Sequence, residues 1–129
     1  MQIYMYEQVT AVYKAASKKF KNLVGSEYIS PNINSGEVVN GILHEDAEKL
    51  SFKDQSFDFI LSCDVFEHVV DYKKCFAEAF RVLRPNGKLC MTLPFYTNMQ
   101  HTQQRAAIND GELVYLKAPL YHGNPMSEE

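Results

Sequence analysis

Apolar and polar residues alternate along this chain in two rhythms, and each rhythm predicts a different element. From residue 7 to residue 20 apolar side chains recur every three or four positions with lysines between them, which predicts an amphipathic helix. Residues 57–62 (FDFILS) are continuously apolar, which is typical of a strand covered on both faces. A second helical stripe follows Asp71, a capping residue, and Pro85-Asn86-Gly87 is expected to end that helix.

Short apolar segments before, between and after the two helices predict the remaining strands. They lie at residues 1–5, 22–31, 37–46 and 88–95. The predicted order is strand, helix, three strands, helix, strand. Alternation of this kind, with crossovers of helical length, predicts an α/β fold of three layers, in which helices cover a mostly parallel sheet.

The chain is expected to divide into a core at 1–96 and a loop-rich C-terminal segment at 97–129, with one weak strand at GELVYLK. If residues 88–95 form the last strand, its outer edge has unpaired N–H and C=O groups that favour pairing with another chain. We therefore expect a homodimer, formed through this strand or through the C-terminal segment. A monomer whose C-terminal segment covers the edge is the alternative.

Composition excludes several classes of protein. The net charge of -3 gives no long-range attraction for phosphate backbones, so nucleic acid is not an expected partner. No apolar run approaches the roughly 20 residues that cross a bilayer, so neither a membrane nor export is expected. Three cysteines without C-x-x-C spacing, in stretches that look buried, favour neither disulfides nor a metal site and indicate the cytoplasm.

Acidic and polar residues follow several of the predicted strands. In an open parallel sheet, ligands bind beyond the carboxyl ends of the strands, so these residues are the first candidates for a site. They are Tyr6, Glu7, Glu27, Tyr28, Glu45, Asp46, Ser62, Cys63 and Asp64. A carboxylate at the end of the second strand suits ribose, because it accepts hydrogen bonds from both neighbouring hydroxyls.

Three motifs carry a family resemblance over roughly residues 2 to 96. They are VGSEYISP, HEDAEKLSFKDQSFDFILSCDVFEHV and FAEAFRVLRPNGKLCMTLPFY, and together they resemble the class I S-adenosylmethionine-dependent methyltransferases, of the methyltransferase type 11 kind. The resemblance implies a Rossmann-like fold, S-adenosylmethionine as cofactor and methyl transfer to a small acceptor. It also implies that Glu27 holds the ribose hydroxyls, that Asp46 holds the adenine amino group beside the Ala47 amide, and that Ser62 to Asp64 line the methionine end.

The chain departs from this family in two ways. The stretch MQIYMYEQVT has no glycine where the family has a glycine-rich loop, and the tyrosines at 4 and 6 would place bulk where the cofactor normally lies. Little sequence remains for the two strands that ordinarily complete the sheet, so the chain resembles a shortened methyltransferase. The alternative function is a non-catalytic binding or oligomerisation module that has lost its cofactor. A nucleotide-binding oxidoreductase is weaker, since no G-x-G-x-x-G follows the first strand.

His68 and Asp64 are the candidate catalytic residues. Methyl transfer depends mainly on the alignment of acceptor, methyl group and sulfur, so few acids and bases are needed. Each candidate residue also has a purely structural interpretation. His68 can be a surface imidazole in a first helical turn, Cys63 a small buried side chain, and the tyrosines part of the core.

Overall fold

The computed structural model describes residues 1–120 of the 129-residue chain. The chain forms two compact units, Met1–Leu93 and Pro94–Glu129. All the predicted site residues lie in the first unit.

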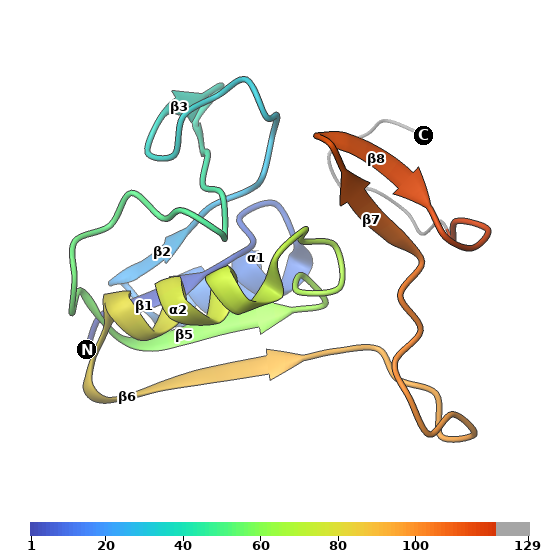
Figure 1. Ribbon diagram of the computed structural model, residues 1–129. Helices are drawn as coiled ribbons and strands as arrows, with labels where there is room; N and C mark the ends of the chain where they lie inside the picture. The colour runs from blue at the N-terminus through green and yellow to red at the C-terminus, as the bar shows by residue number, and fades with distance from the viewer. Residues whose placement is uncertain (121–129) are drawn as a thin grey trace. The chain divides into compact units, whose positions relative to one another are not determined.

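The first unit is built on a sheet of four parallel strands in the order β2-β1-β5-β6 (Figure 1). Their bounds are Ile3–Met5 for β1, Leu23–Gly25 for β2, Phe57–Cys63 for β5 and Leu83–Thr92 for β6. The continuously apolar FDFILS run falls in β5, which lies between β1 and β6. The prediction of an α/β fold with a parallel sheet and a central strand at residues 57–62 is therefore confirmed.

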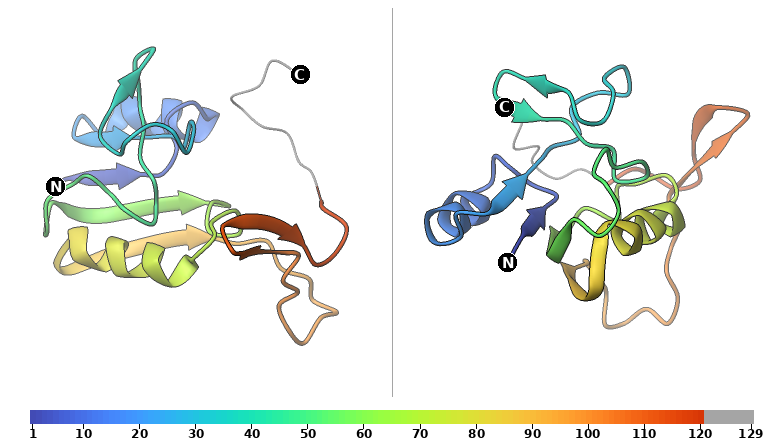
Figure 2. Two further views of the ribbon diagram at one scale, coloured as in Figure 1. Left: turned by 45° about the horizontal axis from the view of Figure 1, so that its top comes forward. Right: turned by 90° about the vertical axis from the view of Figure 1, so that its left-hand side faces the viewer.

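Two helices lie on opposite faces of this sheet, α1 (Ala11–Lys19) beside β1 and β2, and α2 (Tyr72–Val82) on the other side (Figure 2). Each begins at a side-chain cap: the Thr10 hydroxyl accepts from the Tyr13 amide, and the Asp71 carboxylate from two amides of the first turn. The first helix starts four residues later than its apolar pattern predicted, and residues 7–9 belong to the loop that ends β1.

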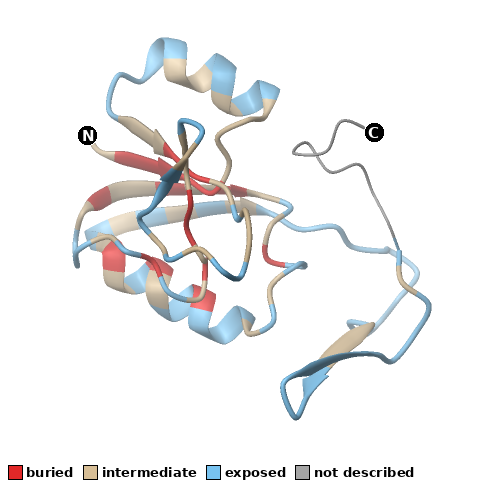
Figure 3. Cartoon of the chain, turned by 90° about the horizontal axis from the view of Figure 1, so that it is seen from above, coloured by how far each residue is buried: buried red, intermediate tan, exposed pale blue. Residues whose placement is uncertain are grey.

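The core lies between the sheet and α2 (Figure 3). It contains Tyr4, Tyr6, Ile60, Ala79 and Val82, all almost fully buried. The apolar stripe predicted for the second helix consisted of Tyr72, Phe76, Ala79, Phe80 and Leu83. It was right for Ala79, which is buried, and wrong for the aromatic residues, because Phe80 is 83% exposed and Tyr72 54% exposed. Cys75 and Val82 pack beside Ala79 in place of the aromatic rings, since smaller side chains let the helix approach the sheet.

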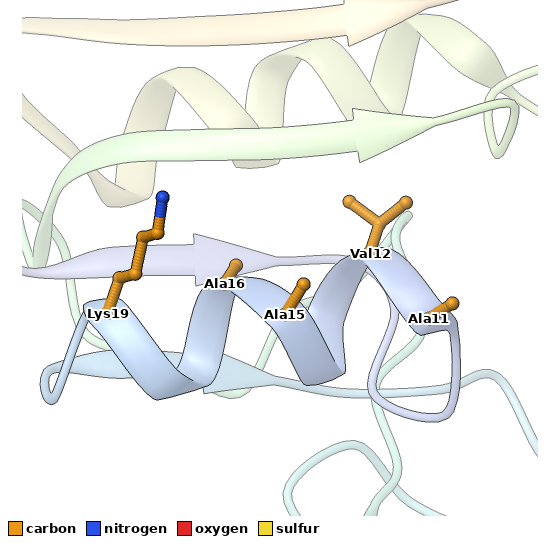
Figure 4. Close-up of a pocket in the computed structure, with 5 residues that line it drawn as sticks. All are labelled: Ala11, Val12, Ala15, Ala16 and Lys19. Atoms are coloured by element: carbon orange, nitrogen blue, oxygen red, sulfur yellow. The ribbon is translucent and has the colours of Figure 1, made fainter.

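Helix α1 contains no fully buried residue. Ala11, Val12, Ala15, Ala16 and Lys19 line a shallow groove along this helix (Figure 4). Their side chains are small and mostly apolar, and no polar group converges on them. The groove therefore has none of the features of a site for a polar ligand.

The predicted strand at residues 37–46 is wrong. This stretch folds into a two-stranded antiparallel hairpin, β3 (Val38–Val39) and β4 (Ile42–Leu43), outside the main sheet. Asn40 and Gly41 form its turn, both with positive φ, as hairpins with two-residue loops require. A single parallel bridge between Glu27 and His44 links the hairpin to the end of β2.

Two further boundaries differ from the predictions. Helix α2 ends at Val82, before Pro85-Asn86-Gly87, and those three residues lie within β6, where the register shifts between Phe57 and Phe59 of the partner strand. In the second unit, the strand expected at GELVYLK is present as β8 (Glu112–Tyr115), and it pairs in a hairpin with β7 (Ala106–Asn109), which was not predicted. The end of the C-terminal segment, residues 121–129, is outside the described residues.

Candidate functional site at the strand ends

Glu7, Glu27, Cys63 and Asp64 follow or end three neighbouring parallel strands. Burial raises the pKa of the Glu7 carboxyl, a hydrogen bond with the Cys63 side chain lowers it, and the charges of Glu27 and Asp64 raise it further. Burial and the Glu7 carboxylate raise the pKa of the Cys63 thiol to about 11. The structure thus brings these four predicted residues together, as an acidic rim that favours a positively charged ligand.

Glu27 holds the loop that follows β1. One of its carboxylate oxygens, Oε1, accepts hydrogen bonds from the amides of Gln8 at 2.8 Å and Val9 at 2.9 Å. These amides lie where the family resemblance places a glycine-rich loop. A carboxylate thereby satisfies the donors of a loop that has no glycine of its own.

Gly25, at the end of β2, allows this loop to approach. A Cβ atom built on Gly25 would lie 2.7 Å from the backbone oxygen of Glu7 and would collide with the ring of Tyr13. Ordinary Cβ atoms do not come this close to backbone, so only glycine fits without movement. The loop after β1 has no glycine, but Gly25 in the neighbouring strand β2 leaves room for the loop to lie close to that strand.

Replacing Gly25 by alanine is therefore expected to lower the free energy of unfolding by about 1–3 kcal/mol, as overpacking does. Thermal unfolding followed by circular dichroism measures this change. Gly111→Ala is the control, because nothing lies within 4 Å of the added carbon there and its cost is limited to a left-handed backbone. A melting temperature of Gly25→Ala equal to that of the wild type would contradict the close packing at Gly25.

A second group of predicted residues lies around the end of the hairpin. Asp46 accepts from the Glu48 amide, and its own amide donates to the Ser35 hydroxyl at 3.0 Å. Ala47 is buried in the core, whereas Tyr28 is 55% exposed, with its ring 5.4 Å from that of His44. Glu45 is buried, and its carboxylate accepts from both the amide and the hydroxyl of Ser51. The Glu45 carboxylate is therefore occupied by hydrogen bonds within the protein.

The residues after β5 are held in different ways. Ser62 is buried, and within residues 1–120 its hydroxyl has no hydrogen-bond partner. Asp64 is exposed, has a positive φ of 53° and accepts a hydrogen bond from the Thr92 hydroxyl of β6 at 2.9 Å. His68 is exposed in the turn before α2, and its Nε2 lies 3.7 Å from Glu67. None of these contacts joins His68 to Asp64.

The tyrosines of the first strand lie in the core rather than over the strand ends. Tyr4 is fully buried and bonds the Ser26 hydroxyl at 2.7 Å, while the ring of Tyr6 packs edge-on against Phe66. We expected these tyrosines to place bulk at the cofactor position. Their packing does not agree with this expectation, because both rings belong to the hydrophobic cluster. The Tyr6 hydroxyl is buried there without a partner in the described part of the chain.

Comparison with known families gives one match, to the model described as a methyltransferase domain, over residues 7–91. The chain belongs to this methyltransferase family. The matched residues begin at Glu7, just after β1, and end in β6, so they include the acidic rim, the hairpin and both helices.

Three relatives illustrate the similarity. Phosphoethanolamine N-methyltransferase 2 of Caenorhabditis elegans is 38% identical over 48 residues, which are 37% of this chain and 11% of that protein. A structure of a complex between the Haloferax volcanii Trm112 methyltransferase activator and a methyltransferase matches with a TM-score of 0.53 and 20% identity, over 71% of this chain and 44% of that one. A Galdieria sulphuraria protein described as a sarcosine dimethylglycine methyltransferase matches with a TM-score of 0.52 and 24% identity, over 70% and 38%.

The family-model match establishes the family, and the two solved structures support the methyltransferase-like fold. The chain spans less than half the length of each of these relatives.

Within residues 1–120, no helix is both long and apolar enough to span a membrane. No three histidine, cysteine, aspartate or glutamate side chains in that range are placed to hold a metal ion.

Sequence reasoning missed two residues of the site. Gln8 links the loop after β1 to the hairpin, and buried His44 accepts from the Ile29 amide through Nδ1 at 3.0 Å. The signal for the hairpin was present as Asn40-Gly41, a dipeptide typical of two-residue turns. No pattern in the sequence indicated Gln8, because its role arises from a contact across 33 to 35 residues.

Proposed function

We propose that this chain contains the S-adenosylmethionine site of a methyltransferase that acts on a small acceptor. The observation that supports it best is Glu27, a carboxylate at the end of β2 that is oriented by two loop amides. Glu7 and Asp64 lie close enough for their charges to interact. A rim of three carboxylates suits a ligand with ribose hydroxyls at one end and positive charge at the other.

The residues present fit this cofactor in chemical type. Glu27 would accept from the ribose hydroxyls, Asp46 from the adenine amino group, and Ser62 to Asp64 would lie beside the methionine end. When bound, the cofactor supplies a sulfonium methyl group for transfer. Tyr6 and Tyr28 would flank the site, one from the core and one from the surface.

The protein's own part in the reaction is positioning and proton transfer. The Thr92 hydroxyl donates to one oxygen of the exposed Asp64 carboxylate, and the other oxygen would help to position the acceptor. His68 is an exposed imidazole that can take the proton an acceptor releases on methylation. The cytoplasm is the compartment we propose, because all three cysteines are free thiols.

Calorimetric titration with S-adenosylmethionine and S-adenosylhomocysteine tests this proposal. We expect dissociation constants in the micromolar range, and at least about tenfold weaker binding in Asp46→Ala, a loss of about 1.4 kcal/mol. Adenosine, which lacks the methionine part, is the matched control ligand and should bind more weakly. If no heat of binding is measured at millimolar ligand, the proposal that this protein is an S-adenosylmethionine-dependent enzyme is refuted.

The alternative, a binding module without cofactor, is favoured by one observation. The loop after β1 has no glycine, and its amides are already bound by Glu27 rather than available to a ligand. Absence of any binding in the titration, with an intact fold by circular dichroism, would support this alternative.

We also propose that the protein is a homodimer through β6. This ten-residue strand is at one end of the sheet, and in the described residues no other strand pairs with its outer edge. Chromatography with light scattering should give a mass of twice 14.8 kDa. A particle of 14.8 kDa at high concentration would refute the homodimer and favour the alternative, a monomer in which the edge of the sheet is covered.

A further inference from the structure

Gln8, Glu27 and Leu43 form a closed ring of hydrogen bonds. The Gln8 amide donates to Oε1 of Glu27 at 2.8 Å, the Glu27 amide to the Leu43 carbonyl at 2.8 Å, and the Leu43 amide to Oε1 of Gln8 at 2.9 Å. Each residue thus donates its own backbone N–H to the next. The three come from the loop after β1, the residues after β2 and the hairpin strand β4 (Figure 1).

The Gln8 side chain occupies the position of a missing strand. Its Nε2 donates to the Gly41 carbonyl at 3.0 Å while its Oε1 accepts from Leu43. These two backbone groups flank Ile42, as do the groups that bond one residue of a neighbouring parallel strand. A primary amide reproduces the donor and acceptor of a peptide group, so Gln8 satisfies the edge of β4 that β3 leaves open.

We propose that Gln8 is the positioning residue of this site. Through the ring it holds Glu27 and the loop after β1 in one arrangement. The hydrogen bonds that Gln8 makes to Glu27 and Leu43 are partly buried, so breaking them leaves polar groups without full solvation. The role in ligand binding rests on the function proposed above, whereas the ordering of the loop does not.

Hydrogen exchange of the ligand-free protein tests the ring directly. Gln8→Met keeps the length of the side chain and removes both of its hydrogen-bonding atoms. The Val9 amide, which donates to Glu27 and makes no contact with the Gln8 side chain, is the informative probe. In Gln8→Met its exchange should become at least about tenfold faster, since a tenfold change corresponds to the loss of about one hydrogen bond. Unchanged exchange at Val9 would overturn the proposal, whether or not any ligand binds.

Asn34→Ala is the matched control. It removes an exposed side-chain bond from Asn34 to Glu37, just before the hairpin, which has no part in the ring. We expect exchange at Val9 to stay as in the wild type. An equal acceleration in Asn34→Ala would show general loosening of the hairpin and would also overturn the proposal.

A double-mutant cycle then tests the link to the ligand. Gln8→Met should weaken S-adenosylhomocysteine about tenfold in the wild-type background and have little effect in Glu27→Gln, because it acts through that carboxylate. Equal effects in both backgrounds would refute positioning through Glu27. If the wild type binds no S-adenosylhomocysteine, the proposed function fails, and the exchange at Val9 still decides the role of Gln8.

Discussion

Tyr4→Ala is expected to cause the largest loss of stability of any single substitution considered for this protein. Tyr4 is fully buried, its hydroxyl bonds Ser26, and its ring contacts three aromatic rings, those of Tyr6, Phe52 and Phe57. Truncating a large aromatic residue in a core costs about 3–5 kcal/mol. Since whole domains are stable by about 5–15 kcal/mol, this change removes a large share.

Urea denaturation followed by circular dichroism measures the loss. Tyr4→Phe keeps the ring but leaves the buried Ser26 hydroxyl without this partner, so it should cost about 1–3 kcal/mol. Tyr72→Ala, at a half-exposed tyrosine of α2, should change stability by less than about 1 kcal/mol. If Tyr4→Ala is as stable as Tyr72→Ala, the placement of β1 at the centre of the core is wrong.

The predictability of this fold depended on how local the signal was. The parallel order and the central β5 followed from the six-residue apolar run at 57–62 and from two helical patterns, the second with Asp71 as its cap, which are local features. The orientation of α2 did not, because its stripe of aromatic residues at positions 72, 76 and 80 was more hydrophobic than the one that packs. Ala79 of the predicted stripe is buried, but packing selected Cys75 and Val82 beside it in place of the larger rings, which hydrophobicity alone does not indicate.

The hairpin shows a different limit. Residues 37–46 have the composition of a strand, and the Asn40-Gly41 turn divides them into two strands of two residues each. The parallel pairing that the strand prediction implied survives as one bridge, Glu27 to His44. The edge of β4 is therefore hydrogen-bonded by a side chain, that of Gln8, where a neighbouring strand would provide backbone groups.

The sequence predicted which acidic residues gather at the candidate site, but it did not predict their hydrogen-bond partners. Glu7, Glu27 and Asp64 were expected to gather because the carboxyl ends of parallel strands lie on one edge of a sheet. Their mutual influence on the pKa of Glu7 agrees with that gathering. The commitment of one Glu27 oxygen to loop amides required the three-dimensional structure, since residues 8 and 27 are distant in sequence. The roles of these residues toward a cofactor stay predictions.

Replacing Glu27 by glutamine is expected to produce the largest loss of ligand binding. The change removes a charged acceptor, and hydrogen bonds to charged groups contribute about 1.5–3 kcal/mol each. Two ribose hydroxyls would lose this partner, so affinity for S-adenosylhomocysteine should fall at least about 100-fold, or about 2.7 kcal/mol. Titration calorimetry measures the loss. Glu37→Gln is the matched control, because Glu37 is an exposed carboxylate before β3 that accepts hydrogen bonds from the backbone and side-chain nitrogens of Asn34. The affinity of this variant should equal that of the wild type.

A deoxyribose analogue of the ligand separates two explanations of that loss. If Glu27 binds the ribose, the analogue binds the wild type weakly, and Glu27→Gln weakens it much less than it weakens the parent ligand. If Glu27 acts only by holding the loop through the amides of Gln8 and Val9, both ligands lose affinity by the same factor in Glu27→Gln. Full retention of affinity by Glu27→Gln would remove the ribose role altogether, because no other carboxylate ends β2.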